Sequence, residues 1–313
     1  MIKQLTHKLL DLVQSYLFII LIALGAGLLL PDKTVFLAPL ATLFLQIIFF
    51  LTSLKLDFQE IFKHVKAWKM ILAANLFMLI IFPIVVWLIT QAVFPTMAVP
   101  LLLLAAMPVG MTAPLLVEVV GGRVSVALIL TLTTSLLAPI TIPFVISLLA
   151  STAVTVSAFT MFWSLIKVIV IPFALAQIIR RLTKKQIDPI TPVFKPISLI
   201  LLGLLIAGVV ARQSEIILAS FGATLVYQMI ALTAFIAVIL VAGYFVAWWR
   251  RCNERVTISV SLTLMNFTLA IYLAGEFFTD PNVLMAAVLV ILPWSLLLIP
   301  YKIIVRKFVC PVK

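Results

Sequence analysis

Charged residues are scarce in this sequence. Asp, Glu, Lys and Arg make up only 10% of its 313 residues, while 65% are hydrophobic; a soluble domain has about 25% charged and about 45–50% apolar residues. Cysteine and histidine are rarer still, with two of each. Two cysteines are too few for a disulfide framework and give no metal-ligand spacing, so we expect Cys252 and Cys310 to be ordinary thiols. The composition excludes a soluble domain and favours a protein that crosses a membrane several times.

The sequence also lacks a catalytic constellation. It contains no HExxH motif, no pair of Asp residues within apolar stretches and no Gly-flanked Ser with a partner His. We therefore predict that the protein is not an enzyme. A passive channel, and a receptor that binds its ligand without moving it, are the alternatives to a carrier. The lack of an appended signalling domain counts against the receptor.

Apolar stretches long enough to cross a bilayer, about 20 residues each, fill most of the chain. We predict an all-α fold with ten spans, five in each half, at roughly 14–31, 35–54, 70–92, 97–120, 124–150, 155–179, 192–211, 218–249, 256–275 and 283–305. Residues 1–313 then form one transmembrane domain, with repeat 1 at about 14–150 and repeat 2 at about 155–305. Because each half has an odd number of spans, the repeats are inverted. Residues 1–13 combine apolar residues at helical spacing with two lysines, which predicts an interfacial helix.

The net charge of +12 is explained by this topology. With a cytoplasmic N-terminus, 19 of the 22 Lys and Arg residues fall in cytoplasmic segments. This positive-inside asymmetry predicts that both termini are cytoplasmic, in the inner or plasma membrane. The basic residues then attract anionic lipid headgroups. The bilayer is therefore the expected partner, with no nucleic acid and no obligate protein partner.

Two of the predicted spans are interrupted at matching positions. Residues 111–114 (MTAP) break the fourth span, and residues 265–268 (MNFT) break the ninth span 154 residues later. Broken helices in corresponding positions of two halves point to the binding site of a secondary transporter. Proline kinks are an alternative explanation, but they need not recur at matched positions. The candidate binding residues at the breaks are Thr112, Ala113, Pro114, Met265 and Asn266.

The residues at each break favour the start of a new half-helix. Thr112 is an N-cap residue type, and Pro114 suits the first helical turn because its missing N–H costs nothing there. Asn266 takes the equivalent position in the other half, and Asn is among the strongest N-cap residues. Each half-helix would begin near the bilayer midplane with free N–H donors and partial positive charge. The breaks therefore favour an anionic ligand.

Two charged residues within the spans are further candidates. Lys167 lies about 12 residues from either end of the sixth span, roughly 18 Å from each interface, so we expect it to face the protein interior. It would attract an anionic substrate or titrate during transport; the alternative is a lysine paired with a carbonyl or a hidden carboxylate. Glu118 is either a proton-coupling acid or a gate or ion-pair partner of Arg123.

The run at 108–114 (PVGMTAP), followed by Gly122, the hydroxyl-rich segment 131–135 and Ala138-Pro139, resembles the bile acid:sodium symporter family. That family belongs to a superfamily of bile acid, arsenite and riboflavin transporters, and the resemblance covers about residues 14–305. It implies ten helices in two inverted five-helix repeats, a panel and a core domain, and broken helices that cross at the site. It also implies that a small organic anion is transported by alternating access.

The family's sodium ligands are largely replaced in this chain. The family pattern has Ser-Asn at the fourth-span break, Ser and Thr on the fifth span, and Glu and Gln on the ninth. The corresponding residues are Ala113, Pro114, Ala127, Thr131, Ser261 and Met265. Sodium needs oxygen ligands, so Thr131 and Ser261 are the remaining side-chain candidates, beside backbone carbonyls at the breaks. We expect no other cofactor; sodium, a proton or no ion drives transport.

Residues 266–270 (NFTLA) are also similar to the arsenite-extruding branch of the superfamily. That branch has a cysteine where Val109 stands and a glutamate where Thr268 stands. Without the thiol, arsenite has no soft ligand. An organic-anion transporter is therefore favoured over an arsenite exporter. A proton-coupled or uncoupled carrier or exporter is the alternative, and the sequence leaves the substrate and the direction of transport open.

Overall fold

The computed structural model describes residues 18–55, 68–151, 157–219 and 222–305, and this part of the chain is all-helical without strands. Seven helices within it are long and apolar enough to cross a membrane: Pro31–Ser53, Trp68–Val93, Val124–Leu149, Ala158–Thr183, Asp188–Ala211, Thr224–Val246 and Pro281–Ile304. Shorter apolar helices are Phe18–Leu29, Pro95–Ala105 and Phe267–Phe277. The prediction of a polytopic α-helical membrane protein is confirmed. The interfacial helix predicted at 1–13 lies outside the described residues.

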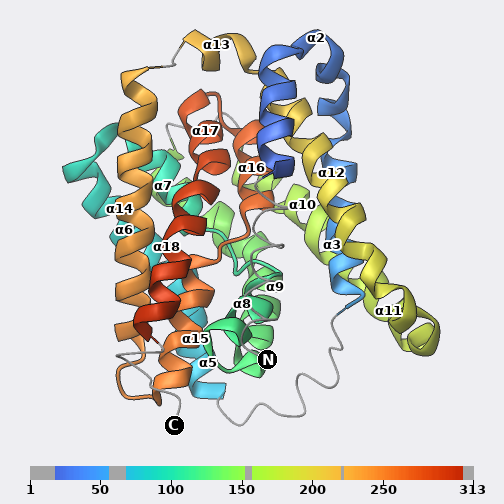
Figure 1. Cartoon of the computed structure of the whole chain (residues 1–313), viewed down its shortest axis with the longest axis vertical. Helices are drawn as coiled ribbons and strands as arrows, with labels where there is room; N and C mark the ends of the chain where they lie inside the picture. The colour runs from blue at the N-terminus through green and yellow to red at the C-terminus, as the bar shows by residue number, and fades with distance from the viewer. Residues whose placement is uncertain (1–17, 56–67, 152–156, 220–221, 306–313) are drawn as a thin grey trace.

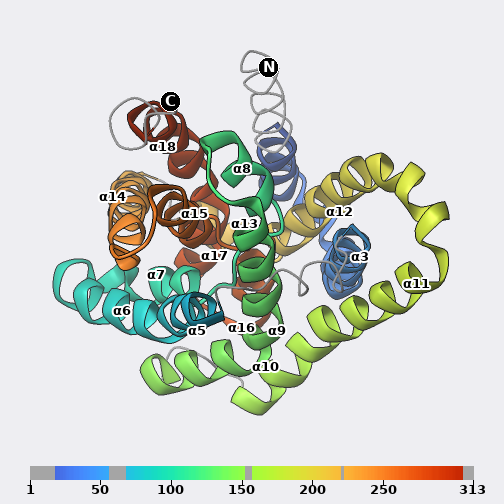
Figure 2. The same ribbon diagram turned by 90° about the horizontal axis from the view of Figure 1, so that it is seen from below.

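A smaller set of helices, here called the side group, lies on the right of Figure 1. In it α3 packs against both α11 and α12. Its elements are α2 (Pro31–Thr34), η1 (Val35–Leu40), α3 (Ala41–Ser53), α10 (Ala158–Leu165), η5 (Ile166–Val170), α11 (Ile171–Ile187), η6 (Asp188–Ile190) and α12 (Thr191–Ala211). The segments α10, η5 and α11 are continuous, and Figure 2 shows them crossing beneath α9 before they reach α3.

A larger set of helices is here called the central group. In it α15 packs against α8, α9 and α14, and α17 packs against α7. Its elements are α5 (Trp68–Leu76), η2 (Phe77–Ile81), α6 (Phe82–Val93), η3 (Pro95–Met97), α7 (Ala98–Ala105), α8 (Ala113–Val120), α9 (Val124–Leu149), α13 (Ser214–Ala219), α14 (Ala223–Val246), α15 (Cys252–Thr263), α16 (Phe267–Phe277), α17 (Pro281–Leu289) and α18 (Ile291–Ile304). The eighth span, predicted at 218–249, is shorter than expected because α13 is a separate helix.

Proline shapes two of the long helices. The π-helical segments η2 and η5 are followed by Pro83 and Pro172, and a π-bulge is a common response to an interrupted helical ladder. In η5 the amide of Ile171 bonds to the carbonyl of Ile166. The next amide in that register would belong to Pro172, which has no N–H. The carbonyl oxygen of Lys167 instead accepts a hydrogen bond from Gln46 Nε2 at 3.1 Å, which joins η5 to α3 within the side group.

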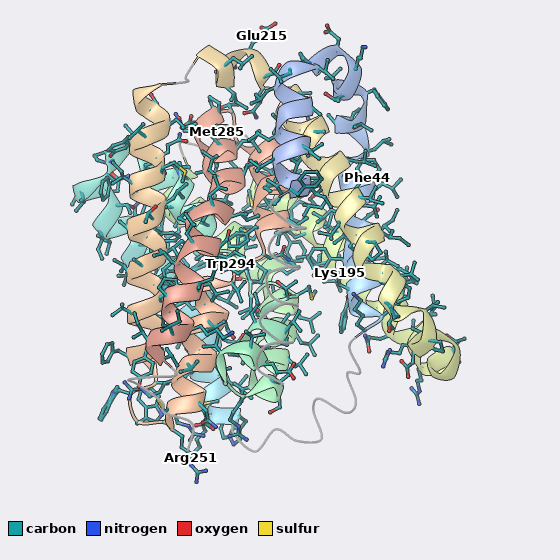
Figure 3. All side chains as sticks on the ribbon, viewed as in Figure 1. Phe44, Lys195, Glu215, Arg251, Met285 and Trp294 are labelled. Atoms are coloured by element: carbon teal, nitrogen blue, oxygen red, sulfur yellow. The ribbon has the colours of Figure 1, made fainter. Side chains whose placement is uncertain are left out.

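A buried carboxylate joins α8 to α15 at the end of the molecule where Figure 3 labels Arg251, opposite the end labelled Glu215. Glu254 is only 1% exposed and pairs with Arg123, which follows α8, and with Arg250 at 2.7 Å. Thr257 Oγ1 also accepts the backbone N–H of Arg123 at 2.7 Å. Arg123 therefore pairs with Glu254, and of the alternatives for Glu118 the ion pair with Arg123 is wrong.

Cys252, the first residue of α15, is disulfide-bonded. The expectation of an ordinary thiol at this position is therefore wrong. The Tyr244 hydroxyl lies 3.4 Å from its Sγ atom. Cys310 lies outside the described residues.

We predict that Glu254→Gln destabilises the protein. Burial alone would raise the pKa of this carboxyl, but hydrogen bonds from Arg250 and Arg123 outweigh burial and hold it below the usual 4.5. The loss at pH 7 should be about 2 kcal/mol, less than for a fully buried pair because both arginines are partly exposed. It should appear as a fall of about 5 °C in the Tm of the purified protein.

The pH dependence provides the control for this prediction. Because the folded pKa lies below the unfolded pKa, the stabilisation is present above the unfolded value and is lost as pH falls through the folded value. The wild type should therefore approach the Glu254→Gln variant only in acid, below pH 4.5. The exposed Glu215→Gln variant should match the wild type throughout, and an equal loss in both variants would contradict the assignment.

Candidate functional site

The two broken helices cross in the middle of the central group. The helix of the first half ends with α7 at Ala105 and resumes with α8 at Ala113, and that of the second half is interrupted between Thr263 and Phe267. Both predicted interruptions are confirmed. Between them lies an antiparallel β-bridge that pairs Val109 with Met265.

Backbone hydrogen bonds hold this crossing together. The amide of Gly110 donates to the carbonyl of Leu264 at 2.6 Å, and the amide of Asn266 donates to the carbonyl of Pro108 at 2.8 Å. From α9, Thr134 Oγ1 accepts the amide of Val109 at 3.1 Å. Non-helical backbone persists at membrane depth only where its polar groups are satisfied in this way. The two interruptions therefore stabilise each other.

The predicted half-helix starts differ in detail. Asn266 is the N-cap of α16, and its Oδ1 accepts the amide of Leu269 at 3.1 Å, which confirms the predicted cap. Thr112 holds the N-cap position of α8, with Pro114 in the first turn, but its side chain makes no capping hydrogen bond. The backbone amides of Thr112 and Thr268 have no acceptor within the described part of the chain. Each half-helix therefore begins with a free N–H donor.

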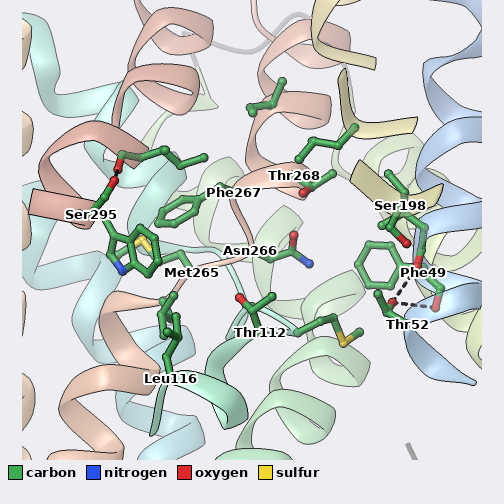
Figure 4. Close-up of a pocket in the computed structure, with 18 residues that line it drawn as sticks. Phe49, Thr52, Thr112, Leu116, Ser198, Met265, Asn266, Phe267, Thr268 and Ser295 are labelled. Atoms are coloured by element: carbon green, nitrogen blue, oxygen red, sulfur yellow. Dashed lines mark hydrogen bonds between the residues drawn. The ribbon is translucent and has the colours of Figure 1, made fainter. Parts of the chain in front are cut away.

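A cavity of about 100 Å³ lies against both half-helix starts, enough for several water molecules or a small solute. Thr112, Asn266 and Thr268 line it from the crossing. Figure 4 shows Thr112 and Asn266 near its centre, with side chains of α3 and α12 on one side and of α16 and α18 on the other. None of its 18 lining residues is charged. The cavity thus combines a polar centre with largely apolar walls.

The structure brings only some of the predicted site residues together. Met265 lines the cavity with Thr112 and Asn266. The other candidates are buried outside its lining: Ala113, Pro114, Thr131 and Ser261. Sequence reasoning missed the walls supplied by distant elements, which include Phe49 of α3, Ser198 of α12 and Trp294 of α18. Neither a motif nor a spacing in the sequence identifies them, because only tertiary packing brings them to the crossing.

Neither charged candidate lines the cavity. The Lys167 side chain is exposed, although Val168 and Ile169 beside it are buried. The expectation that Lys167 faces the protein interior is therefore wrong. The position of a residue along a span does not tell which side of the helix it occupies. Glu118 of α8 is exposed as well.

The two hydroxyls predicted as sodium ligands are buried and unpaired. Thr131 Oγ1 and Ser261 Oγ make no hydrogen bond within the described residues, and both side chains are fully buried. They are free oxygen donors. The described residues nevertheless contain no group of three His, Cys, Asp or Glu side chains placed to hold a metal ion. Ala113, Pro114, Ala127 and Met265 supply no side-chain oxygen, so the donor set does not match a carboxylate-containing sodium site.

We predict that Gly110→Ala weakens the crossing. A Cβ atom there would lie 3.0 Å from the Met265 carbonyl oxygen and 3.1 Å from that of Leu264, and backbone atoms cannot move aside as a flexible side chain can. The Tm should fall by several degrees, whereas Gly25→Ala, whose Cβ would meet no atom within 4 Å, should leave it unchanged or raise it. Equal stability of the two variants would contradict a tight crossing.

Comparison with known proteins identifies the family of this chain. A sequence profile described as the sodium bile acid symporter family matches residues 42–220, which is more than half of the 313 residues. A search of curated proteins finds no match. The match extends from α3 through the first broken helix to α13. The chain is therefore a member of the sodium bile acid symporter family.

Proposed function

We propose that this protein is a secondary transporter that carries a small organic anion across the inner or plasma membrane by alternating access. The observation that carries the proposal is the pair of free amides, at Thr112 and Thr268, on two half-helices that border one cavity. Each amide can donate to an anionic oxygen. The partial positive charges of both helix starts favour the same ligand charge.

We further propose ten membrane helices in two inverted five-helix repeats. The supporting observation is the offset of 154 residues between Thr112 and Asn266, which both occupy N-cap positions. The antiparallel bridge between Val109 and Met265 is the contact expected of two equivalent segments that run in opposite directions. In this arrangement both termini are cytoplasmic, as the Lys and Arg distribution predicts.

The cavity also limits the charge of the substrate. No Lys or Arg is among the described residues that line it, so helix starts and hydrogen bonds stabilise the bound anion there without a full opposite charge. These donors suffice for one carboxylate or sulfonate. A second anionic group would lie in apolar surroundings without a compensating partner. The walls, which include Phe49 and Trp294, suit an apolar body. The proposed substrate is an amphipathic organic anion with one anionic head.

We propose that a sodium gradient does not drive transport. The residues aligned with the family's sodium ligands retain two hydroxyls, of Thr131 and Ser261, and no carboxylate, so the requirement of sodium for several oxygen ligands is not met by side chains. A proton-coupled or uncoupled carrier is the alternative. Glu118 is the nearest acid to the crossing along α8 and is the candidate for the proton.

Bulky apolar substitutions at the helix starts should abolish binding. Asn266→Leu removes the side-chain cap of α16 and fills the polar centre of the cavity. Thr112→Leu places an apolar side chain in the same centre at the start of α8. Binding of small carboxylates and sulfonates to purified protein, measured by calorimetry, should weaken at least about tenfold, since hydrogen bonds to charged groups are worth about 1.5–3 kcal/mol. Ser147→Leu, at an exposed position of α9, is the control. Normal ligand affinity in both cavity variants would contradict the assignment of the binding site.

Replacement of potassium by sodium in the buffer should leave the Tm of the protein unchanged. A sodium site filled to about 100 times its Kd would stabilise the fold by about 2.7 kcal/mol, which a Tm measurement resolves easily. We expect equal Tm values in the two salts and uptake into proteoliposomes that does not follow a sodium gradient. A sodium-specific rise in Tm that disappears in Thr131→Val would show that hydroxyls and carbonyls suffice to bind the ion.

A further inference from the structure

The helix α16 has different neighbours along its length. It starts at the cavity, which Asn266, Phe267 and Ile271 line, and its last residue is Phe277. Eleven residues correspond to a helix of about 16 Å. It packs against α3 and α12 of the side group, and Tyr272 and Gly275 in its farther half face these two helices, on the side of α2 and α13 in Figure 1. We call this end of the molecule the outer end, following the predicted topology.

A buried tyrosine joins three helices at this point. Tyr272 of α16 is 2% exposed, and its hydroxyl lies 3.2 Å from Thr42 Oγ1 of α3 and 3.0 Å from Ser164 Oγ of α10. In the sequence Tyr272 directly follows Ile271, which lines the cavity. The three hydroxyls therefore bridge the central and side groups immediately beyond the cavity, toward the outer end.

Close packing continues this contact farther along α16. A Cβ atom on Gly275 would lie 2.1 Å from Val209 Cγ1 of α12, so only glycine permits this approach of the two helices. One residue later, Glu276 lies 3.8 Å from Arg212. Both of these charged side chains are about half exposed, so the ion pair contributes little. The contact depends mainly on the tyrosine hydrogen bonds and the glycine packing.

The opposite end of the molecule lacks an equivalent bridge among the described residues. There α8 and α15 pack against each other and against α9, while α11 packs against α3. Figure 1 shows the lower ends of α3 and α11 diverging from α8 and α9. Tyr272 and Gly275 thus join α16 to the side group beyond the cavity at the outer end, whereas α3 and α11 diverge from α8 and α9 at the other end.

We infer that Tyr272 is the latch of the outer gate. This inference rests on the proposed alternating-access function, in which the cavity must open toward each side in turn. Opening toward the outer end requires the hydroxyl of Tyr272 to leave Thr42 and Ser164, and α16 to separate from Val209. Two hydrogen bonds between neutral groups are strong enough to bias the closed state and weak enough to break in every cycle. A ligand on Asn266 binds the same helix that carries the latch.

The test measures access to the cavity from each side of the membrane. Ser198 lines the cavity from α12. The Ser198→Cys variant is labelled in intact cells with a membrane-impermeant maleimide, and the protein without this substitution gives the background. In the wild-type gate, labelling from the outer side should be slow. Tyr272→Phe should accelerate it roughly tenfold, because both latch hydrogen bonds are lost, and should slow labelling from the inner side in inverted vesicles.

Tyr301→Phe is the matched control. This substitution likewise removes a hydroxyl, which donates a hydrogen bond to Ser259 Oγ at 2.7 Å. That bond, however, joins α18 to α15 within the central group. Outer labelling should then equal that of the wild type. If Tyr272→Phe and Tyr301→Phe give the same outer labelling rate, Tyr272 is not the latch. No substrate is needed, so failure of this test is distinct from failure of the proposed transport.

A second variant tests the same gate through packing. Gly275→Ala pushes α16 away from Val209 and should also accelerate outer labelling of the cysteine at position 198. Val209→Ala in the same protein removes the Cγ1 atom that the new Cβ meets at 2.1 Å and should restore slow labelling. A Gly275→Ala variant that labels as slowly as the wild type, or a double variant that labels as fast as the single one, would overturn the gate.

Discussion

The rest of the structure depends on the backbone pairing at Val109 and Met265. A chain that leaves the helical conformation at membrane depth exposes N–H and C=O groups that lipid cannot satisfy. Here each interruption supplies the partner for the other, through the bonds from Gly110 to Leu264 and from Asn266 to Pro108. A single interruption would have had no such partner. The pairing is therefore the condition that lets two half-helices start beside one cavity.

Local chemistry was predictable from the sequence because it depends on neighbouring residues. Proline is favoured in the first turn of a helix, as at Pro114, and Asn266 is a strong N-cap, so both half-helix starts could be placed to within a residue. The capping hydrogen bond could be foreseen for Asn266 but does not form at Thr112. Residue type therefore predicts where a helix begins, while the orientation of the side chain also depends on the packing around it.

Contacts between distant residues could not be read from the sequence. Nothing in the sequence marks Glu254 of α15 as buried, yet it lies between two arginines with only 1% of its side chain exposed. Lys167 looked like an interior charge because of its depth, yet the structure places it on an exposed face. Depth along a span gives the distance to the interface and not the direction around the helix. In both cases the missing information was which neighbouring helix lies against which face.

The arrangement of α16 explains how binding and access can be linked without a long pathway. Coupling requires an element with two arrangements that a ligand at one place and a gate at another both bias. A helix of about 16 Å held rigid by its own hydrogen bonds meets this requirement, because a ligand at Asn266 and the latch at Tyr272 lie on one body. The other half of the same broken span, α15, is fixed to the end of α8 through the ion pair of Glu254 with Arg123. Movement of α16 against the side group then changes the outer contact, while the crossing that shapes the cavity stays intact.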